Sequence, residues 1–311
     1  MNYEIDRLEA GPNTSAKGIY LARVISNAPI CREHFRLTIE VDDFPLARPG
    51  QFLHILCRDP EDIHWLGGAF IRRPFSLGGL RRNGGRAEID IIHRVIGPGT
   101  RWLSHLQPGD TVNVLGPQGK PFTIDSGRPI AYLVGGGVGL PPILWLAEAV
   151  RDTGLRGIAF CGARTADLLP LTLRPGVTIE PGEPAAAFED FSRFDTPAVV
   201  CTDDGSLGTR GLIPDAFESY LQRHRDQADQ ATVYTCGPEP MMRAVAAVCE
   251  KYNLPCQVCM ERMMACGMGT CQSCVVPIRD AVDPQGWRYR LCCTDGPVFD
   301  SRQILWEEVC S

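Results

Sequence analysis

The chain has 311 residues, of which 44% are hydrophobic and 22% charged, with 32 Gly and 25 Pro. This composition excludes disorder, and the length exceeds one comfortable hydrophobic core, so two or three domains are expected. A net charge of -6 with no block of Lys or Arg argues against a nucleic-acid or anionic-membrane surface.

The first expected domain, residues 17–126, alternates short apolar runs with Gly, Pro, Asn and Asp turn signals. Short strands without helices between them predict an antiparallel β-barrel. One short helix is expected within 99–110, after a Gly-rich loop. The expected strands lie within 19–30, 34–46, 50–59, 75–97 and 109–119.

Within this domain, Arg73-Pro74-Phe75-Ser76 places an Arg two residues before an aromatic and three before a Ser. This tetrapeptide resembles the R-x-Y-[ST] flavin signature of the ferredoxin reductase superfamily. In that family the Arg meets the flavin pyrophosphate, for which a forked guanidinium is suited. Taken alone, the tetrapeptide could also be a surface Arg beside an ordinary strand.

A second segment, Ile92-His93-Arg94, leads into a Gly-rich turn in which Gly99 is followed by Thr100. Thr100 can cap the short helix that follows, and a helix N-terminus with free N–H groups is a ready phosphate site. Together the two segments predict FAD as the ligand of the first domain.

From 127 to 253 strands alternate with helices, which predicts a mainly parallel, doubly wound sheet with ligands at the carboxyl ends of its strands. The expected strands are 129–134, 157–163, 197–205 and 231–237, and the expected helices are 140–152, 212–224 and 238–252.

Two loops at these strand ends predict a nicotinamide nucleotide site for NAD(H) as co-substrate. The first is not a strict G-x-G-x-x-G, but it follows a strand and precedes a helix, as a nucleotide loop must. In ferredoxin-reductase-like proteins a C-G-P segment lies beside the nicotinamide, which implies Cys236 near the site of hydride transfer. The alternative for Cys236 is a small buried hydrophobe at a strand end. The loop residues are Gly135, Gly136, Gly137, Gly139, Cys236, Gly237 and Pro238.

The compartment determines how the 14 cysteines are interpreted. No apolar run reaches the roughly 18 to 20 residues of a membrane span, and residues 1–18 lack a signal-peptide pattern, so a cytoplasmic protein is expected. In a reducing cytosol, clustered cysteines favour metal binding or catalysis over disulfides. Cys57, Cys161 and Cys201 lie in apolar runs and are expected to be small buried hydrophobes.

The C-terminal segment, 254–311, contains Cys266, Cys271 and Cys274 in the spacing C-x4-C-x2-C, with Cys292-Cys293 further on. This is the spacing of a plant-type 2Fe–2S site. Intervening glycines let the backbone curl close around a cluster. A segment this short can build only a small hydrophobic core, and such small domains commonly need a metal or a crosslink for stability. Spacing alone leaves open which of the two later cysteines is the fourth ligand.

Zinc is the alternative metal, since Cys256 and Cys259 could supply a second C-x2-C pair. We expect these two on a strand, where residues i and i+3 point to opposite faces, so a structural role is favoured. The predicted fold is therefore a β-barrel, a doubly wound α/β nucleotide domain and a small C-terminal iron–sulfur domain.

Seven motifs in order resemble one family, the electron-transfer subunit of the two-component, NAD-dependent dihydroorotate dehydrogenase. The most specific are E-R-M-M-A-C-G-M-G-T-C-Q-S-C at 261–274 and C-T-D-G-P-V-F at 293–299. The other five are R-P-F-S, H-R-V-I-G-P-G-T, G-G-G-V-G-L-P-P, T-D-D-G-S-L-G-T and C-G-P-E-P-M-M.

In that family the closing cysteine immediately precedes an x-D-G-P stretch, which implies Cys293 as the fourth ligand. The chain departs from the family at His93, where relatives usually have Tyr, and at Pro121 in a loop near the flavin.

The resemblance further implies electron transfer between NAD and an FMN-containing dihydroorotate dehydrogenase catalytic subunit, in a heterotetramer of two of each, for pyrimidine biosynthesis. One alternative keeps the cofactors and changes the partner, as in sulfide dehydrogenase, NADH-dependent ferredoxin:NADP oxidoreductase, sulfite reductase or hydrogenase complexes. A different class of function is a zinc-binding module without redox activity.

Overall fold

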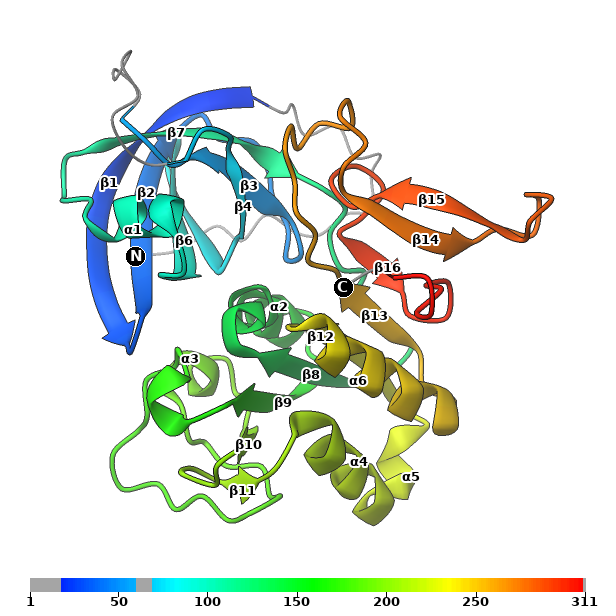
Figure 1. Cartoon of the computed structure of the whole chain (residues 1–311). Coiled ribbons are helices and arrows are strands. Elements are labelled where there is room, and N and C mark those ends of the chain that lie inside the picture. Colours follow the sequence, from blue (N-terminus) through cyan, green and yellow to red (C-terminus); the bar gives the residue numbers. More distant parts are fainter. Residues whose placement is uncertain (1–17, 60–68, 310–311) are drawn as a thin grey trace.

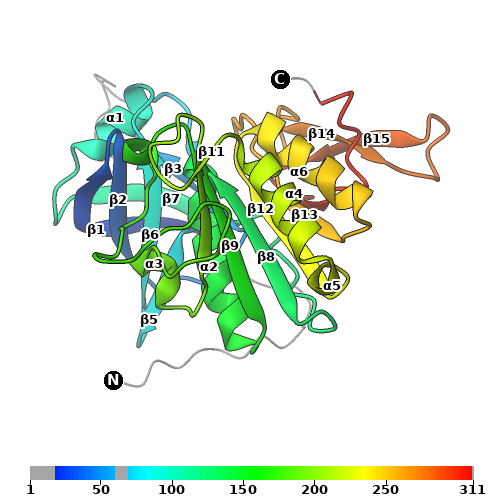
Figure 2. The same ribbon diagram turned by 90° about the horizontal axis from the view of Figure 1, so that it is seen from below.

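The computed structural model describes residues 18–59 and 69–309, so residue 17, the first of the expected barrel domain, lies outside the described residues. Two seven-stranded sheets and a two-stranded hairpin make up its β structure (Figures 1 and 2). Among the described residues, no helix is long and apolar enough to span a bilayer.

The N-terminal sheet is antiparallel throughout, with the strand order β4-β3-β7-β1-β2-β6-β5. The expected run 75–97 contains several strands because the chain reverses at Gly84-Gly85, where Gly84 has φ +62° and Asn83 pairs with Arg86. Its strands are β1 (Gly18–Cys31), β2 (His34–Asp42), β3 (Phe52–Leu56), β4 (Arg73–Ser76), β5 (Gly79–Asn83), β6 (Arg86–Arg94) and β7 (Thr111–Gln118).

Alternation along these strands builds the first core. On β6, Ala87, Ile89 and Ile91 are fully buried at a spacing of two, as expected for one face of a pleated strand. The expected short helix is α1 (Pro98–Ser104), whose Leu103 joins the same core. The predicted antiparallel β fold of this region is thus confirmed.

The second sheet has the order β11-β10-β9-β8-β12-β13-β16 and is parallel except for its last strand. Its strands are β8 (Ile130–Gly136), β9 (Arg156–Ala163), β10 (Ala198–Thr202), β11 (Thr209–Arg210), β12 (Ala231–Cys236), β13 (Cys256–Cys259) and β16 (Val298–Asp300). The helical elements are η1 (Gly137–Gly139), α2 (Leu140–Asp152), η2 (Ala166–Leu168), α3 (Glu189–Ser192), α4 (Ile213–Arg223), α5 (Arg225–Ala228) and α6 (Glu239–Lys251).

Helices cover both faces of this sheet, as predicted (Figure 2). Successive β8 residues point to opposite sides: Tyr132 packs in the cluster that contains α4 and α6, and Leu133 in the cluster that contains α2. The doubly wound fold is confirmed, whereas β11, α3 and α5 were not expected, because two- and four-residue elements carry too few positions to show a period.

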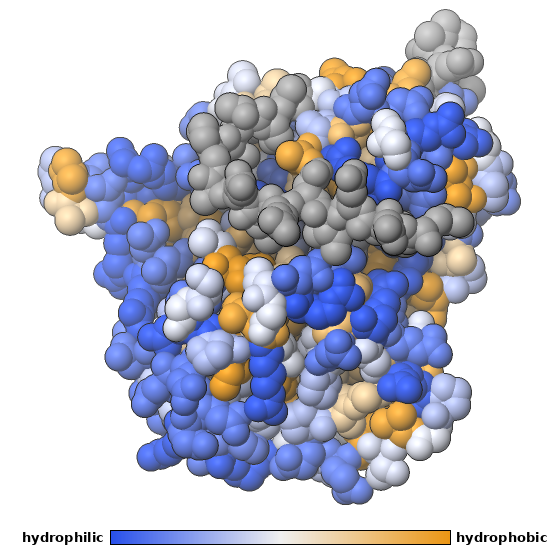
Figure 3. Space-filling model, turned by 180° about the vertical axis from the view of Figure 1, so that it is seen from behind, coloured by the Kyte–Doolittle hydropathy of each residue, from blue (hydrophilic) through white to orange (hydrophobic). Residues whose placement is uncertain are grey.

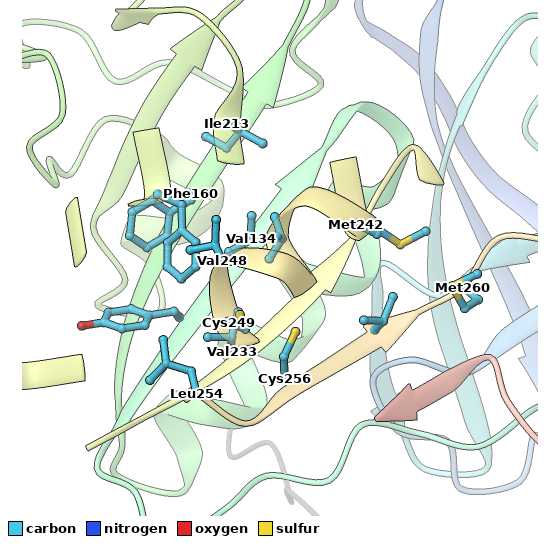
Figure 4. Close-up of a cluster of buried hydrophobic side chains, with 14 of the residues drawn as sticks. Val134, Phe160, Ile213, Val233, Met242, Val248, Cys249, Leu254, Cys256 and Met260 are labelled. Atoms are coloured by element: carbon cyan, nitrogen blue, oxygen red, sulfur yellow. The ribbon is translucent and has the colours of Figure 1, made fainter. Parts of the chain in front are cut away.

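The sheet continues past residue 253, because β13 pairs with β12 and β16 pairs with β13. Cys256 and Cys259 lie on β13 and belong to the cores on opposite faces, which confirms the strand prediction for both. Figure 4 shows Cys256 in the first of these cores. Between β13 and β16 the chain forms the cysteine loop, residues 264–274, and the hairpin of β14 (Val275–Arg279) and β15 (Trp287–Leu291).

The hairpin extends from the body of the molecule and pairs only with itself among the described strands (Figure 1). Its inner residues Val276 and Ile278 are buried, whereas Tyr289 is exposed. Seen from behind the view of Figure 1, the coloured surface has hydrophobic residues scattered among hydrophilic ones (Figure 3).

Candidate functional site

The two flavin segments meet inside the first sheet. Phe75 on β4 and His93 on β6 pack edge to face with ring centroids 6.2 Å apart. A second ring, Phe35, stacks on His93 at 5.9 Å. Phe75 and His93, 18 residues apart in the sequence, are therefore neighbours in the fold, and Ile92 and Arg94 flank His93 on β6.

Arg73 begins β4 and is exposed. Among the described residues, its guanidinium donates to the carbonyls of Ile71 and Arg72, at 3.3 and 3.4 Å, and takes part in no ion pair. Pro74 and Ser76 of the same strand are partly buried. A guanidinium held by backbone carbonyls alone remains able to bind a phosphate oxygen.

His93 is almost completely buried, and both of its ring nitrogens lack a hydrogen-bond partner among the described residues. Burial lowers the pKa of His93 to about 4. The ring is therefore neutral at physiological pH, with orphaned polar atoms of the kind that a bound polar group satisfies.

Thr100 differs from its expected position. The helix begins at Pro98 with Gly97 as its N-cap residue, so Thr100 lies in the first turn rather than before it. Its hydroxyl accepts hydrogen bonds from the N–H groups of Ile96 and Gly97, at 2.9 and 3.1 Å. Thr100 thus caps the helix from its first turn, by accepting from the N–H of the N-cap residue. Gly99 is tightly packed, because a Cβ added to it would lie 3.1 Å from the Cβ of Cys57.

The two nicotinamide loops pack against each other at the carboxyl ends of β8 and β12. A Cβ on Gly139 would lie 2.3 Å from the Cys236 carbonyl oxygen, and a Cβ on Gly136 would lie 2.6 Å from the Met241 sulfur. Gly137 has φ +54° and open space above it, and Gly135 contacts Leu140. Glycine is required here by close approach between the loops.

Cys236 is buried, with 1% of its surface exposed, and it is in register with Cys259 on β13. A side-chain hydrogen bond with Cys259, together with burial, raises the pKa of Cys236 well above its ordinary value. Gly237 and Pro238 continue directly into α6. The structure thus shows a neutral, packed thiol at the strand end.

The cysteine loop brings its thiols together as two pairs. The N–H groups of Met268 and Cys271 both donate to the Cys266 sulfur at 3.4 Å. Cys293 donates its N–H to the Cys274 sulfur, also at 3.4 Å. These contacts place Cys271 beside the Cys266 sulfur and Cys293 beside the Cys274 sulfur. The Cys266 and Cys274 thiols contribute to the pKa shifts of Cys271 and Cys293, respectively.

Two pairs of thiols suit a binuclear cluster, in which each iron takes two cysteines, better than a single ion. The backbone N–H groups aimed at sulfur are the donors that an iron–sulfur site requires. Gly267 and Gly269 have φ of +72° and +88°, which lets the loop curl around the sulfurs.

Cys292 and Cys293 point in different directions. The Cys292 thiol donates to the Met260 carbonyl at 3.4 Å and is fully buried. Burial raises the pKa of Cys293 to about 12 in the ligand-free arrangement. Cys293 lies beside Cys274, because its backbone N–H donates to the Cys274 sulfur.

The outer side of the loop is open. Cys271 is exposed, and hydrogen bonding from Ser273 lowers the pKa of its thiol to about 6. Met263 and Met268 beside it have 90% and 56% of their surface exposed. The predicted cluster position therefore reaches the surface at Cys271.

Two residues outside the expected site connect it to the rest of the fold. Arg262 forms an ion pair of 2.6 Å with Glu239, the first residue of α6. His54 on β3 lies against the cysteine loop, with Nδ1 3.3 Å from the Cys266 carbonyl oxygen. A polar residue in the apolar run "FLHIL" was the one signal for His54 in the sequence.

A cavity of about 480 Å³ lies elsewhere, between the hairpin and β16. Its lining includes Lys120, Arg279, Asp280 and Asp300, so it carries charges of both signs. None of the expected site residues lines this cavity.

Comparison with known families gives two matches. Residues 261–305 match the iron–sulfur cluster binding domain of dihydroorotate dehydrogenase B. Residues 45–121 match the siderophore-interacting FAD-binding domain. The matches cover the cysteine loop and the strands that carry the flavin segments.

Two similar proteins align with this chain over nearly their whole length. The electron transfer subunit of dihydroorotate dehydrogenase B (NAD(+)) from Caldanaerobacter subterraneus subsp. tengcongensis is 33% identical, over 92% of this chain and 98% of its own. The corresponding subunit from Desulforamulus reducens is 30% identical, over 93% and 99%.

Among solved structures, the NADH-dependent reduced ferredoxin-NADP oxidoreductase, described for flavin-based electron bifurcation, matches with a TM-score of 0.72 and 27% identity. The match covers 93% of this chain and 91% of that one. The ferredoxin reductase of carbazole 1,9a-dioxygenase, at 20% identity and a TM-score of 0.60, shares the fold.

Proposed function

Because the chain belongs to the family of electron transfer subunits of dihydroorotate dehydrogenase B (NAD(+)), we propose that it carries electrons between a dihydroorotate-oxidising catalytic subunit and NAD in pyrimidine biosynthesis. The observation that carries this proposal is the cysteine loop, whose four thiols form two close pairs against the flavin-binding sheet. The chemistry that FAD and a 2Fe–2S cluster supply when bound is conversion between hydride transfer and single-electron transfer.

The cluster ligands proposed are Cys266, Cys271, Cys274 and Cys293. Support comes from the paired sulfurs, from the N–H donors to them, and from the orientation of Cys292 toward Met260. These features fit the binuclear site and leave Cys256 and Cys259 in the cores of the sheet, away from a zinc knuckle.

For FAD we propose the residues that surround the meeting point of β4 and β6. The exposed Arg73 would hold the pyrophosphate, and the buried His93 would supply unpaired nitrogens to the cofactor. The full set is Arg73, Pro74, Phe75, Ser76, Ile92, His93, Arg94, Gly99 and Thr100.

For NAD(H) we propose the two packed loops at the ends of β8 and β12. Cys236 would line the nicotinamide position as a neutral thiol, because its raised pKa makes a thiolate unfavourable. The remaining residues are Gly135, Gly136, Gly137, Gly139, Gly237 and Pro238.

We propose functional units at 17–126 for FAD, 127–253 for NAD and 254–311 for the cluster, although β13 and β16 of the last unit complete the sheet of the second. The partner proposed is an FMN-containing catalytic subunit, two copies with two of this chain, in the cytoplasm. Its docking face would include the exposed Cys271 and Met268, where the cluster site reaches the surface.

The test is co-expression with an FMN-containing dihydroorotate dehydrogenase subunit, followed by purification and assay of dihydroorotate-dependent NADH formation. We expect a stable complex with this activity, which the catalytic subunit alone should lack. Size-exclusion chromatography with light scattering measures the stoichiometry.

A second candidate rests on the structural match to the NADH-dependent reduced ferredoxin-NADP oxidoreductase. There the chain would serve another partner with the same cofactors. Dye reduction by NADH without any coupling to dihydroorotate would favour this function. Protein that binds zinc, with neither flavin nor dye reduction, would reject both.

A further inference from the structure

We propose that His54 is a positioning residue that fixes the cysteine loop against the flavin-binding strands and thereby sets the surroundings of the Cys266 sulfur. The inference rests on the proposed assignment of Cys266 as a cluster ligand. His54 lies on β3, more than two hundred residues from the loop in sequence, and its side chain is fully buried.

The first observation is a polar contact. His54 Nδ1 lies 3.3 Å from the Cys266 carbonyl oxygen, so Nδ1 carries the proton and donates. This bond is made to the backbone of a proposed ligand and not to its sulfur. It therefore fixes the position of the Cys266 backbone and, through it, the position of the sulfur.

The second observation is steric. A Cβ placed on Gly267 would lie 2.3 Å from His54 Nδ1 and 2.9 Å from Cε1. The imidazole thus fills the space directly over the Cys266–Gly267 peptide. The packed ring opposes movement of the loop toward the sheet, and the hydrogen bond opposes movement away from it.

The third observation is the rigid attachment of His54 to the flavin segment. His54 pairs with Pro74 across β3 and β4, and its neighbour Leu53 pairs with Phe75. The Arg72 guanidinium donates to the His54 carbonyl at 3.2 Å. One residue therefore links the strand proposed to bind FAD with the loop proposed to bind the cluster.

Packing alone does not account for an imidazole here. His54 Nε2 is buried without a partner among the described residues, which costs free energy that a leucine would avoid. The function of the ring follows from what lies beyond Cys266. The N–H groups of Met268 and Cys271 reach its sulfur only in the curled loop, and such donors set the potential of an iron–sulfur cluster.

Two pairs of variants test the proposal. His54→Asn keeps an amide donor near the position of Nδ1, whereas His54→Gln places it near Nε2 and leaves the Nδ1 position empty. His54→Leu keeps apolar volume without a donor. His34→Leu is the matched control, because His34 is also buried in the first sheet but bonds the Arg32 carbonyl, at 2.8 Å, instead of the loop.

The first readout is alkylation of Cys266 in cluster-free protein, followed by peptide mass spectrometry. We expect Cys266 to be alkylated about fivefold faster in His54→Gln and His54→Leu, because each variant loses one hydrogen bond to the loop. In His54→Asn the rate should return close to that of the wild type. The second readout is the potential and electron paramagnetic resonance spectrum of the reconstituted cluster. Both should shift in His54→Gln and remain near wild type in His54→Asn.

Equal labelling in wild type and His54→Gln would overturn the proposal, as would equal effects of His54→Gln and His54→Asn. An effect of His34→Leu as large as that of His54→Leu would show general loosening of the sheet and would also overturn it. If wild-type protein assembles no cluster, the proposed function fails while the labelling comparison still decides the role of His54.

Discussion

Among the described residues, thiols lie in pairs in two regions, the second sheet and the cysteine loop, and the cluster is proposed for the loop. In the second sheet, Cys236 lies beside Cys259, and Cys249 lies beside Cys256. In the cysteine loop, Cys266 lies beside Cys271, and Cys274 beside Cys293. Proximity of sulfurs therefore does not distinguish a cluster site from a core.

The surroundings of the thiols make the difference. The Cys249–Cys256 pair lies among apolar side chains such as Val233 and Leu254 (Figure 4), and hydrogen bonding between these thiols, with burial, raises the pKa of Cys249 well above its ordinary value. In the cysteine loop, burial raises the pKa of Cys293 as well, but by contrast backbone N–H groups donate to the sulfurs of Cys266 and Cys274. The Ser273 hydroxyl contacts the sulfur of Cys271. Such donors stabilise thiolates, the form that binds metal.

The largest expected effect concerns the fourth ligand. Cys293→Ala should abolish the cluster, because it removes one of two thiols from a pair, whereas Cys292→Ala should leave it intact. Iron and labile sulfide per chain, with the visible spectrum, measure the outcome after anaerobic reconstitution. Cluster loss in Cys292→Ala with retention in Cys293→Ala would reverse the assignment.

Accessibility gives the next largest contrast. In native cluster-free protein with reductant and chelator present, iodoacetamide should alkylate Cys271 on the order of 100-fold faster than Cys249 or Cys256. Cys271 is exposed, whereas the other two are buried in the sheet core. Peptide mass spectrometry over a time course measures each rate, and denatured protein is the control for intrinsic reactivity. Comparable rates in native protein would remove the distinction between the regions.

Features that depend on local sequence were predicted, whereas features that depend on contacts between distant segments were not. The two β architectures, the three main helices of the second sheet and the strand position of Cys256 and Cys259 follow from local periodicity. His54 was missed because its function depends on a loop more than two hundred residues away. Thr100 was expected to cap the helix that follows it, but the helix begins earlier, at Pro98, and Thr100 lies in its first turn. Proline is favoured at the first position of a helix, so the sequence allowed this earlier start.

The cysteine loop shows a second limit. Spacing predicted Cys266, Cys271 and Cys274 as ligands but left Cys292 and Cys293 equivalent. For two adjacent residues, spacing does not tell which side chain faces the other three cysteines. The structure separates them through the Met260 carbonyl and the Cys274 sulfur, both supplied by other segments.

The smallest expected effect tests the connection between the two regions. Arg262 joins the start of the cysteine loop to Glu239 on α6, with side chains only 14% and 24% exposed, and its Nε also donates to the Val275 carbonyl at 3.3 Å. Arg262→Ala should lower the free energy of unfolding by about 1 to 2 kcal/mol, between the values for exposed and buried pairs.

Denaturant unfolding of cluster-free protein measures this change, and Arg288→Ala is the matched control. Arg288 pairs with Asp280 at 2.5 Å, but its side chain is 47% exposed and both residues belong to the hairpin region. Its loss should cost less than about 0.5 kcal/mol. Equal costs for the two variants would mean that the Arg262–Glu239 pair adds nothing beyond a surface contact, and that the loop is held to the sheet by its backbone and by His54 alone.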